Sequence, residues 1–126
     1  MDYSSRRYAG VIVAIPTGRI DHANADAFKR SLEPELREGS ALVLDLAGVE
    51  YISSVGLRVL MIAAKELHAS QRKLAVAALQ PVVGEILTIS RFNLILDVFP
   101  SVRTALETLS APALAAYDAA AQEGRS

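Results

Sequence analysis

Residues 41–60 read ALVLDLAGVEYISSVGLRVL, and this stretch sets the expectation for the fold. Its first six residues form a nearly continuous apolar run, which is typical of a strand covered on both faces in a parallel sheet. The stretch from Val55 to His68 is long enough for a helix, and it is so rich in Leu, Met, Ile and Ala that most of its circumference is expected to be buried. The core side chains predicted from this strand and helix are Leu42, Leu44, Leu46, Val59, Leu60 and Ile62.

The N-terminal residues predict two strands followed by a helix. Residues 3–8 and 11–15 have the character of short strands joined by a tight turn, and residues 16–18 are expected to close the second strand. Apolar residues spaced by three and four then indicate an amphipathic helix from Asn24, its expected N-cap, to Arg37. Pro34 lies inside this pattern and predicts a kink or break, because it lacks a backbone N–H and clashes with the preceding turn.

The rest of the chain continues the alternation of strand and helix. Residues 47–52 are expected to be a connection, and a helix from Pro81 to about Ser90 is expected to carry Val82, Ile86 and Ile89 on one side. Strands are expected at residues 74–78 and 94–98, and a helix at residues 101–109. Alternating elements with short connections imply parallel neighbours and right-handed crossovers. The prediction is an α/β fold with a mostly parallel central sheet, an antiparallel N-terminal strand and helices packed on the sheet.

The C-terminal residues differ in composition from the rest. We expect one domain over residues 1–110 and an alanine-rich tail over residues 111–126, in which seven of the eleven residues from Ala111 to Ala121 are alanine. Alanine favours a helix but supplies little apolar bulk for docking. The sequence therefore leaves open a marginal docked helix or a disordered tail, and we expect that removing residues 111–126 leaves the fold and partner binding intact.

Composition excludes several classes of function. The chain has 126 residues, is 52% hydrophobic and 21% charged, and carries a formal net charge of -1. These values exclude general disorder, and they provide no bulk attraction to nucleic acid or anionic lipid. The absence of cysteine removes disulfides and thiol chemistry, and a reducing compartment is permitted. No signal peptide or membrane-spanning run is apparent. We expect a cytoplasmic protein without membrane insertion, direct nucleic-acid binding or a cofactor.

The sequence offers little for catalysis. A serine hydrolase elbow needs glycine two residues before and two after the nucleophile, and Ser54 has Ile52 in the first of these positions. No phosphate-binding or dinucleotide glycine fingerprint occurs. The two histidines, His22 and His68, are not spaced as metal ligands. The expectation is a protein that is not an enzyme and has no metal site, with a small hydrolase as the weakest alternative.

The informative polar residues are Ser53 and Ser54, which lie where a buried strand has ended and an apolar helix begins. One interpretation is structural: either serine is the helix N-cap and accepts a hydrogen bond from a first-turn amide. A second interpretation is compatible with the first. A phosphate on an exposed serine at a helix N-terminus meets free amides and the positive end of the helix dipole, so the domain could be modified without unfolding. Gly56 lacks a Cβ and costs the helix about 1 kcal/mol relative to alanine, which indicates close approach by another backbone.

At these residues the chain resembles the STAS domain family, specifically its stand-alone anti-sigma factor antagonists. The stretch VLDLAGVEYISSVGLRVL at residues 43–60 is similar to the family signature. Two further stretches support the resemblance: GRIDHANA at residues 18–25, with its acidic residue, and LDVFPSVRTAL at residues 96–106. The resemblance covers about residues 3–109, in the expected order and spacing, and it implies the STAS-type arrangement of sheet and helices.

The resemblance implies a partner switch. Members of the family bind a serine/threonine-kinase anti-sigma factor and so release a sigma factor. The kinase phosphorylates one serine of the antagonist and ends the interaction, and a serine phosphatase restores it. By motif position the acceptor here is Ser54, with Ser53 as the second candidate, because Ser53 stands where many members carry Asp and Val55 where many carry a second Ser. The docking surface implied by the same positions comprises Asp21, Ser53, Val55, Gly56 and Arg58.

A rival interpretation belongs to another class of function. The same fold can serve as a non-catalytic scaffold or ligand-binding subunit, for instance in a transporter accessory complex or a stress-signalling assembly, with Ser54 only a helix cap. Neighbouring genes for a kinase-type anti-sigma factor would favour the switch, and transporter genes would favour the scaffold.

Overall fold

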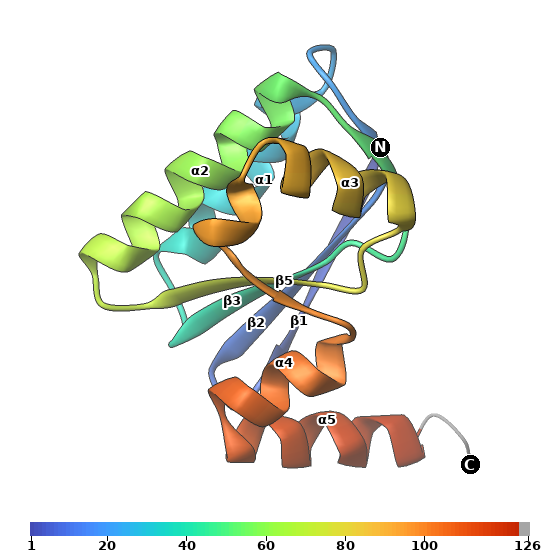
Figure 1. The fold of residues 1–126 in the computed structure, drawn as a ribbon. Coiled ribbons are helices and arrows are strands. Elements are labelled where there is room, and N and C mark those ends of the chain that lie inside the picture. Colours follow the sequence, from blue (N-terminus) through green and yellow to red (C-terminus); the bar gives the residue numbers. More distant parts are fainter. Residues whose placement is uncertain (124–126) are drawn as a thin grey trace.

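A six-stranded sheet forms the centre of the computed structural model, which describes residues 1–123 (Figure 1). The strand order is β1-β2-β3-β5-β6, and β4 pairs with the far end of β2. Among the described residues only the β1–β2 pair is antiparallel, so the predicted mostly parallel sheet with an antiparallel N-terminal strand is confirmed. The strands are β1 (Asp2–Tyr8), β2 (Val11–Ile20), β3 (Ala41–Asp45), β4 (Val49–Ile52), β5 (Lys73–Ala77) and β6 (Asp97–Phe99).

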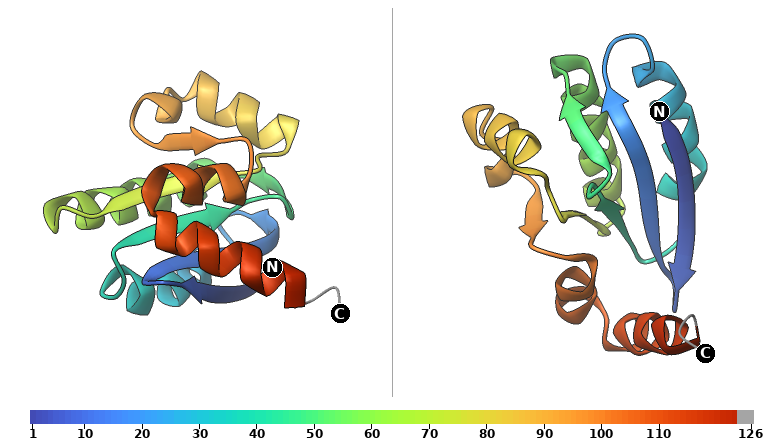
Figure 2. Two further views of the ribbon diagram at one scale, coloured as in Figure 1. Left: turned by 90° about the horizontal axis from the view of Figure 1, so that it is seen from below. Right: turned by 90° about the vertical axis from the view of Figure 1, so that its right-hand side faces the viewer.

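Helices cover both faces of the sheet (Figures 1 and 2). One face carries α1 (Ala25–Leu36), α2 (Ser54–Ala69) and α3 (Pro81–Ile89), and the other carries α4 (Val102–Leu109) and α5 (Ala111–Glu123). A short 3-10 turn, η1 (Phe92–Leu94), leads from α3 towards β6.

The apolar strands are explained by two cores that share one sheet. In β3, Leu42 and Leu44 pack under α1–α3, whereas Ala41 and Val43 pack against α4 and α5. The side chains of β2 and β5 alternate between the same two cores. A strand that is buried on both faces has no position for a polar side chain, which accounts for its unbroken apolar run.

Five of the six predicted core residues are buried, and the prediction for Ile62 is wrong. Ile62 is 37% exposed, while Leu60 of the same helix is fully buried. The reason is geometric: the apolar residues of α2 extend beyond the side that meets the sheet, and the helix covers only one face of the sheet, so its outer side stays in solvent. Val55 and Ile62 are two turns apart on that outer side, and Val55 is 43% exposed.

The expected connection at residues 47–52 contains a strand, β4. It pairs in parallel with residues 18–20, because β2 does not end at residue 15 but continues through Pro16 and Gly18 to Ile20. The register between β2 and β4 shifts at Gly18–Arg19, and the chain takes a left-handed conformation at Gly18, with φ +92°. A β-bulge of this kind re-aims a strand end, and here it directs β2 towards the start of α2.

Four local expectations also need correction. The helix α1 continues to Leu36 without a break, because Pro34 lies in its last turn. Asn24 does not cap α1 with its side chain. Its Oδ1 instead accepts a hydrogen bond from the backbone N–H of Asp21, and its Nδ2 donates one to the carbonyl of Arg19. The expected strand at residues 94–98 is η1 followed by the shorter β6. In α3, Val83 and Leu87 are buried, while Val82 and Ile89 face solvent.

The alanine-rich segment over residues 111–123 is a docked helix, α5, that packs against α4 and β1. Ala113 is fully buried, and the Tyr117 ring lies edge-on to Tyr8 with 5.3 Å between centroids. Arg103 of α4 pairs with Asp118 at 3.1 Å. The last part of the sequence-defined tail, residues 124–126, lies outside the described residues.

Candidate phosphorylation and docking site

The N-terminus of α2 separates the roles of the two serines. Ser53 is the N-cap: its backbone is extended, and its hydroxyl oxygen accepts a hydrogen bond from the backbone N–H of Gly56 at 3.3 Å. Ser54 is the first helical residue, its side chain is exposed, and its hydroxyl forms no hydrogen bond with residues 1–123. The structural role that the sequence left open between the two serines therefore falls to Ser53.

A backbone hydrogen bond ties this helix start to the end of β2. The N–H of Ser53 donates to the carbonyl of Ile20 at 2.8 Å, which places Asp21 beside the cap. The Asp21 carboxylate accepts a hydrogen bond from the N–H of Ala23 at 3.0 Å, so it is held by its own loop. The structure thus brings Asp21 together with the serine pair.

The exposed side of α2 continues the site away from the cap. Val55 and Arg58 both face solvent, and Arg58 forms no ion pair within the described part of the chain. With Ile62 they follow the spacing of one helix face. The result is a free hydroxyl, two aliphatic side chains and one cation on a single surface.

Gly56 belongs to the site in a different way, because it is buried. A Cβ at this position would lie 2.8 Å from Cγ1 of Ile52 and 2.9 Å from Cγ2 of Ile20, closer than real Cβ contacts allow. The close approach expected from the sequence is therefore to this chain's own strand ends. Glycine lets the first turn of α2 sit directly on β2 and β4, which positions Ser53 and Ser54.

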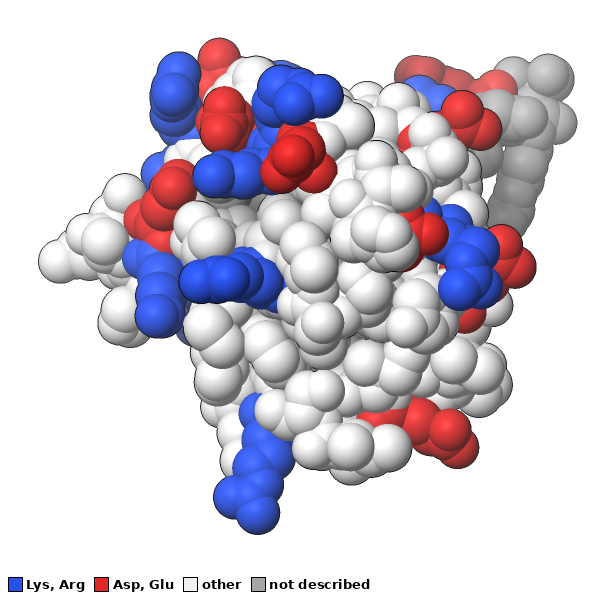
Figure 3. All heavy atoms as spheres, turned by 90° about the horizontal axis from the view of Figure 1, so that it is seen from above, with Lys and Arg blue, Asp and Glu red and all other residues white. Residues whose placement is uncertain are grey.

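The exposed surface of α2 and α3 combines large aliphatic side chains with a few charged ones. Figure 3 shows a wide area without Lys, Arg, Asp or Glu in the middle of this side of the molecule, with charged side chains grouped around its edge. The exposed large aliphatic side chains that α2 and α3 contribute are Val55, Ile62, Val82 and Ile89. Such a surface suits a protein partner better than a nucleic acid.

Two residues at the same end of the sheet escaped the sequence analysis. The guanidinium of Arg19 lies 4.4 Å from the ring centre of Tyr51, to which it is opposite in the β2–β4 register. Tyr51 is two residues before Ser53, so this cation–π pair flanks the serine site. The sequence signal that could have revealed strand β4, and with it Tyr51, is the pattern of residues 49–52, which is apolar at its ends and polar at Glu50.

Other kinds of site find no support among the described residues. No group of three or more His, Asp and Glu side chains in residues 1–123 could hold a metal ion. Over the same residues, the helices lack the combination of length and apolar character that crossing a membrane requires.

Comparison with known proteins identifies the family. The family model for the STAS domain matches residues 3–105. BtrV of Bordetella bronchiseptica, named as an anti-sigma factor antagonist, is 38% identical over 92 residues, which is 72% of this chain and 77% of that protein.

Two solved structures extend the likeness to the fold. The crystal structure of an anti-sigma factor antagonist from Mycobacterium paratuberculosis has a TM-score of 0.80 and 25% identity, covering 85% of this chain and 92% of that one. The Bacillus cell fate determinant SpoIIAA, in its phosphorylated form, has a TM-score of 0.68 over 86% of this chain and 100% of that one, and at 11% identity it supports the fold alone. The chain therefore belongs to the STAS domain family, and its relatives in sequence and structure include anti-sigma factor antagonists.

Proposed function

We propose that this protein is an anti-sigma factor antagonist that binds a serine/threonine-kinase anti-sigma factor and thereby releases a sigma factor. In this proposal the kinase phosphorylates Ser54 and ends the interaction, and a serine phosphatase reverses the modification. The protein acts as a binding partner and substrate in the cytoplasm, not as an enzyme. Family membership and the name of the Bordetella relative support the antagonist role.

The observation that carries the proposal is that Ser53 caps α2 and Ser54 does not. Ser53 makes the capping hydrogen bond, and the exposed hydroxyl of Ser54 forms no hydrogen bond within the described chain. A kinase can therefore modify Ser54 without removing a contact that the fold needs. Ser53 is a poorer target for phosphorylation, because its hydroxyl oxygen already accepts a hydrogen bond from the N–H of Gly56.

The fold is expected to tolerate the phosphate. Phosphorylation adds about -1.5 to -2 charges and three acceptor oxygens. At the first residue of α2 these charges lie beside the positive end of the helix dipole and first-turn amides that lack helical partners. The modified domain should therefore keep its structure, and the effect of the phosphate should be felt by the partner.

The docking surface supplies the reason for dissociation. Ser54 follows the cap residue Ser53, whose N–H binds the carbonyl of Ile20 next to Asp21. It shares the exposed part of α2 with Val55 and Arg58, and Gly56 lets this turn lie directly on the strand ends. The side of the molecule shown in Figure 3 has a wide uncharged area, and α2 itself exposes Val55 and Ile62. A partner that fits this surface must desolvate whatever Ser54 carries, and a buried, unpaired charge costs several kcal/mol. Electrostatic exclusion then ends binding without a large conformational change.

Phosphorylation mapping tests the proposal. The protein is incubated with ATP and each kinase-type anti-sigma factor encoded in its own genome, and the modified residue is identified by mass spectrometry. Ser54→Ala should abolish incorporation of phosphate, while Ser53→Ala, which keeps the acceptor, serves as the matched control. Phosphate on Ser53 with Ser54 unmodified would contradict the assignment, and failure of every such kinase to bind the protein would contradict the function.

A further inference from the structure

Arg58 lies one helical turn after Ser54 on the exposed part of α2. Residues four apart on a helix are neighbours, with about 5–6 Å between their Cβ atoms. Helical side chains also lean towards the N-terminus of the helix, so a long side chain at the later position extends over the earlier one. The guanidinium of Arg58 can therefore reach a group that is carried by Ser54.

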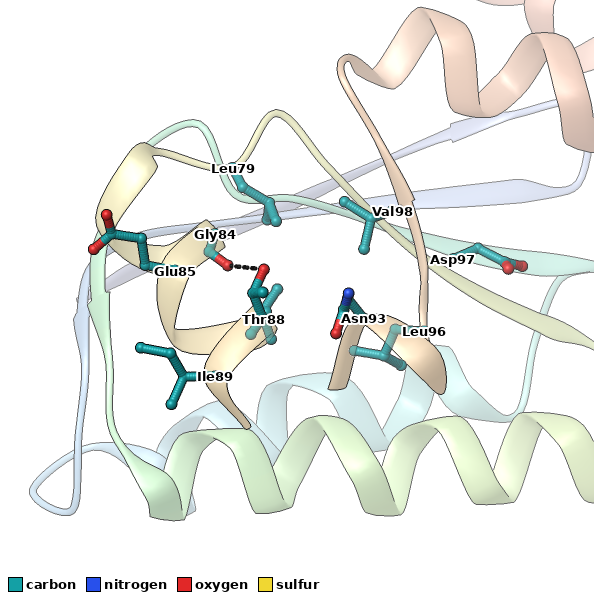
Figure 4. Close-up of a pocket in the computed structure, with 10 residues that line it drawn as sticks. Leu79, Gly84, Glu85, Thr88, Ile89, Asn93, Leu96, Asp97 and Val98 are labelled. Atoms are coloured by element: carbon teal, nitrogen blue, oxygen red, sulfur yellow. Dashed lines mark hydrogen bonds between the residues drawn. The ribbon is translucent and has the colours of Figure 1, made fainter. Parts of the chain in front are cut away.

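Arg58 has no carboxylate partner within residues 1–123. The first turn of α2 contains no acidic residue. Asp21, beside the cap, accepts the N–H of Ala23. On the neighbouring α3, the side chain of Glu85 lies at the outer end of the hollow between α3, η1 and β6 and is directed away from α2 (Figure 4). The guanidinium of Arg58 is thus available to an anion that arrives at this surface.

The position of Arg58 is unfavourable as long as no anion is present. The N-terminus of a helix carries a partial positive charge from its free N–H groups, which disfavours a cation nearby. Arg58 is only the fifth residue of α2, and its side chain leans back towards that end. Lys65 of the same helix lies in the C-terminal half, where the dipole favours a cation. A charge that is placed against local preference is typical of a functional site.

We propose that phosphoserine at position 54 pairs with Arg58 and thereby withdraws this cation from the docking surface. The inference rests on the proposed function, because it requires a phosphate on Ser54. Transfer of the γ-phosphoryl group of ATP joins phosphorus to Oγ of Ser54 and releases ADP and the hydroxyl proton. The guanidinium then donates two hydrogen bonds to phosphate oxygens, in the bidentate geometry that arginine favours.

The pairing reverses the charge that a partner meets at this turn of α2. In the unmodified protein, Arg58 presents one exposed positive charge. The phosphate adds about -1.5 to -2 charges, of which one guanidinium offsets only one. The turn therefore changes from positive to negative. A partner carboxylate that binds Arg58 before phosphorylation loses its cation and meets an anion afterwards.

A protein with phosphoserine installed at position 54 during synthesis tests the pairing without any kinase. Phosphorus NMR measures the second pKa of the phosphoserine. A neighbouring guanidinium favours the dianion, so this pKa should be lower than in Arg58→Gln by about 0.5, which is about threefold in proton affinity. Arg58→Lys keeps the positive charge and should retain part of the effect. Asp21 is present in all of these proteins, so its influence cancels.

Lys65→Gln is the matched control for the loss of a cation from α2. Lys65 is exposed and lies eleven residues after Ser54, about 16 Å along the helix axis, so its removal should leave the pKa of the phosphoserine unchanged. An equal pKa with and without Arg58, or an equal effect of Lys65→Gln, would overturn the pairing. Either result would leave phosphorylation of Ser54 itself untouched.

Binding to the kinase partner tests what the cation does before phosphorylation. Arg58→Gln should weaken binding of the unphosphorylated protein about tenfold, which is about 1.4 kcal/mol, and Arg58→Glu, which reverses the charge as the phosphate does, should weaken it further. Thermal melts of both variants check that the fold is kept, and Lys65→Gln should bind like the unmodified protein. Binding of Arg58→Gln as tight as that of the unmodified protein would overturn the withdrawal of Arg58 as part of the switch. Absence of binding by the unmodified protein would instead contradict the proposed function.

Discussion

The hydroxyl oxygen of Ser53 accepts the backbone N–H of Gly56 at 3.3 Å, and this one contact fixes which of two adjacent serines caps α2. The capping geometry depends on the extended backbone of Ser53, with φ -84° and ψ 172°. That backbone is in turn held by the hydrogen bond from the N–H of Ser53 to the carbonyl of Ile20. The cap of α2 is thus set by the end of a strand more than thirty residues earlier.

Alanine substitution should separate the two serines by stability. Ser53→Ala removes the cap and is expected to lower the free energy of unfolding by about 1 kcal/mol. Ser54→Ala removes an exposed hydroxyl without a partner in the described chain, and it should change the free energy of unfolding by no more than about 0.5 kcal/mol. Urea denaturation of the unmodified protein and both variants measures the difference. Equal losses, or a larger loss for Ser54→Ala, would show that the cap is shared or lies at Ser54.

The two helical glycines should respond to alanine in opposite directions. Gly56→Ala forces a Cβ to within 2.8 Å of Ile52 and 2.9 Å of Ile20, and such overpacking is expected to cost about 1–3 kcal/mol. Gly84→Ala places its Cβ in open space and should raise the free energy of unfolding by up to about 1 kcal/mol, because alanine is the better helix former. Each glycine is the other's control in thermal melts, and stabilisation by Gly56→Ala would contradict the packing described for α2.

The sequence predicts those elements whose burial is complete. The strands β3 and β5 and the helix α2 were predicted because continuous apolar runs have few alternative structures. The strand β4 was missed, because four residues carry little periodicity and its existence depends on pairing with β2 beyond the bulge at Gly18–Arg19. The prediction for Ile62 was wrong for a related reason: when apolar residues occupy more of a helix than the side that meets the sheet, their pattern does not show which of them are buried.

The site shows the same division between local and tertiary information. Ser53 and Ser54 could be selected from the sequence, since a polar pair between two apolar elements is a local signal. The choice of cap could not, because it depends on the Ser53–Ile20 hydrogen bond. Gly56 was interpreted as a sign of close approach, but its neighbours Ile20 and Ile52 became apparent only when β2 and β4 were placed side by side.

The phenol of Tyr3 makes stability sensitive to alkaline pH. Burial, together with its hydrogen bond to the Glu35 carboxylate, raises the pKa of Tyr3 well above its usual value. The unfolded chain loses this proton at about pH 10, whereas the folded chain retains it. The resulting stabilisation is therefore fully present below about pH 10 and is lost progressively as the pH rises above it.

Tyr3→Phe removes this titration. The variant should be less stable than the unmodified protein at neutral pH, because the hydrogen bond to Glu35 is lost, and the difference should shrink above about pH 10. Urea titrations at a series of pH values check the convergence. A difference that stays constant across the alkaline range would mean that Tyr3 titrates alike in both states.

Removal of residues 111–126 should weaken the fold without abolishing it. The larger core under α1–α3 does not involve α5, so a chain ending at Ser110 is expected to fold cooperatively. It loses the buried Ala113 and the contact of Tyr117 with Tyr8, and its melting temperature should fall by several degrees, since about 1 kcal/mol corresponds to roughly 4–8 °C in a domain of this size.

Two point variants show which contacts of α5 matter. Tyr117→Ala should reproduce part of the loss, because an edge-on aromatic pair contributes about 0.5–1.5 kcal/mol beyond its buried area. Asp118→Asn breaks only the exposed pair with Arg103 and should leave the melting temperature nearly unchanged. A truncated chain that no longer melts cooperatively would show instead that α5 is needed to close the core beneath α4.

Charge at Ser54 should control partner binding without changing the fold. Ser54→Asp places an acid at the first residue of α2, where the helix dipole favours it, so the variant should melt at or slightly above the temperature of the unmodified protein. The same carboxylate must be desolvated when a kinase partner covers Val55 and Arg58, and it should weaken binding about a hundredfold or more, which is about 2.7 kcal/mol or more.

Two control variants separate charge from shape at this position. Ser54→Ala should bind constitutively in the presence of ATP, and Ser54→Asn has nearly the shape of Ser54→Asp without its charge. Calorimetric titration of the four proteins with the kinase decides the matter: binding of Ser54→Asp as tight as that of the unmodified protein would exclude electrostatic exclusion, and equal weakening by Ser54→Asn would assign the effect to shape.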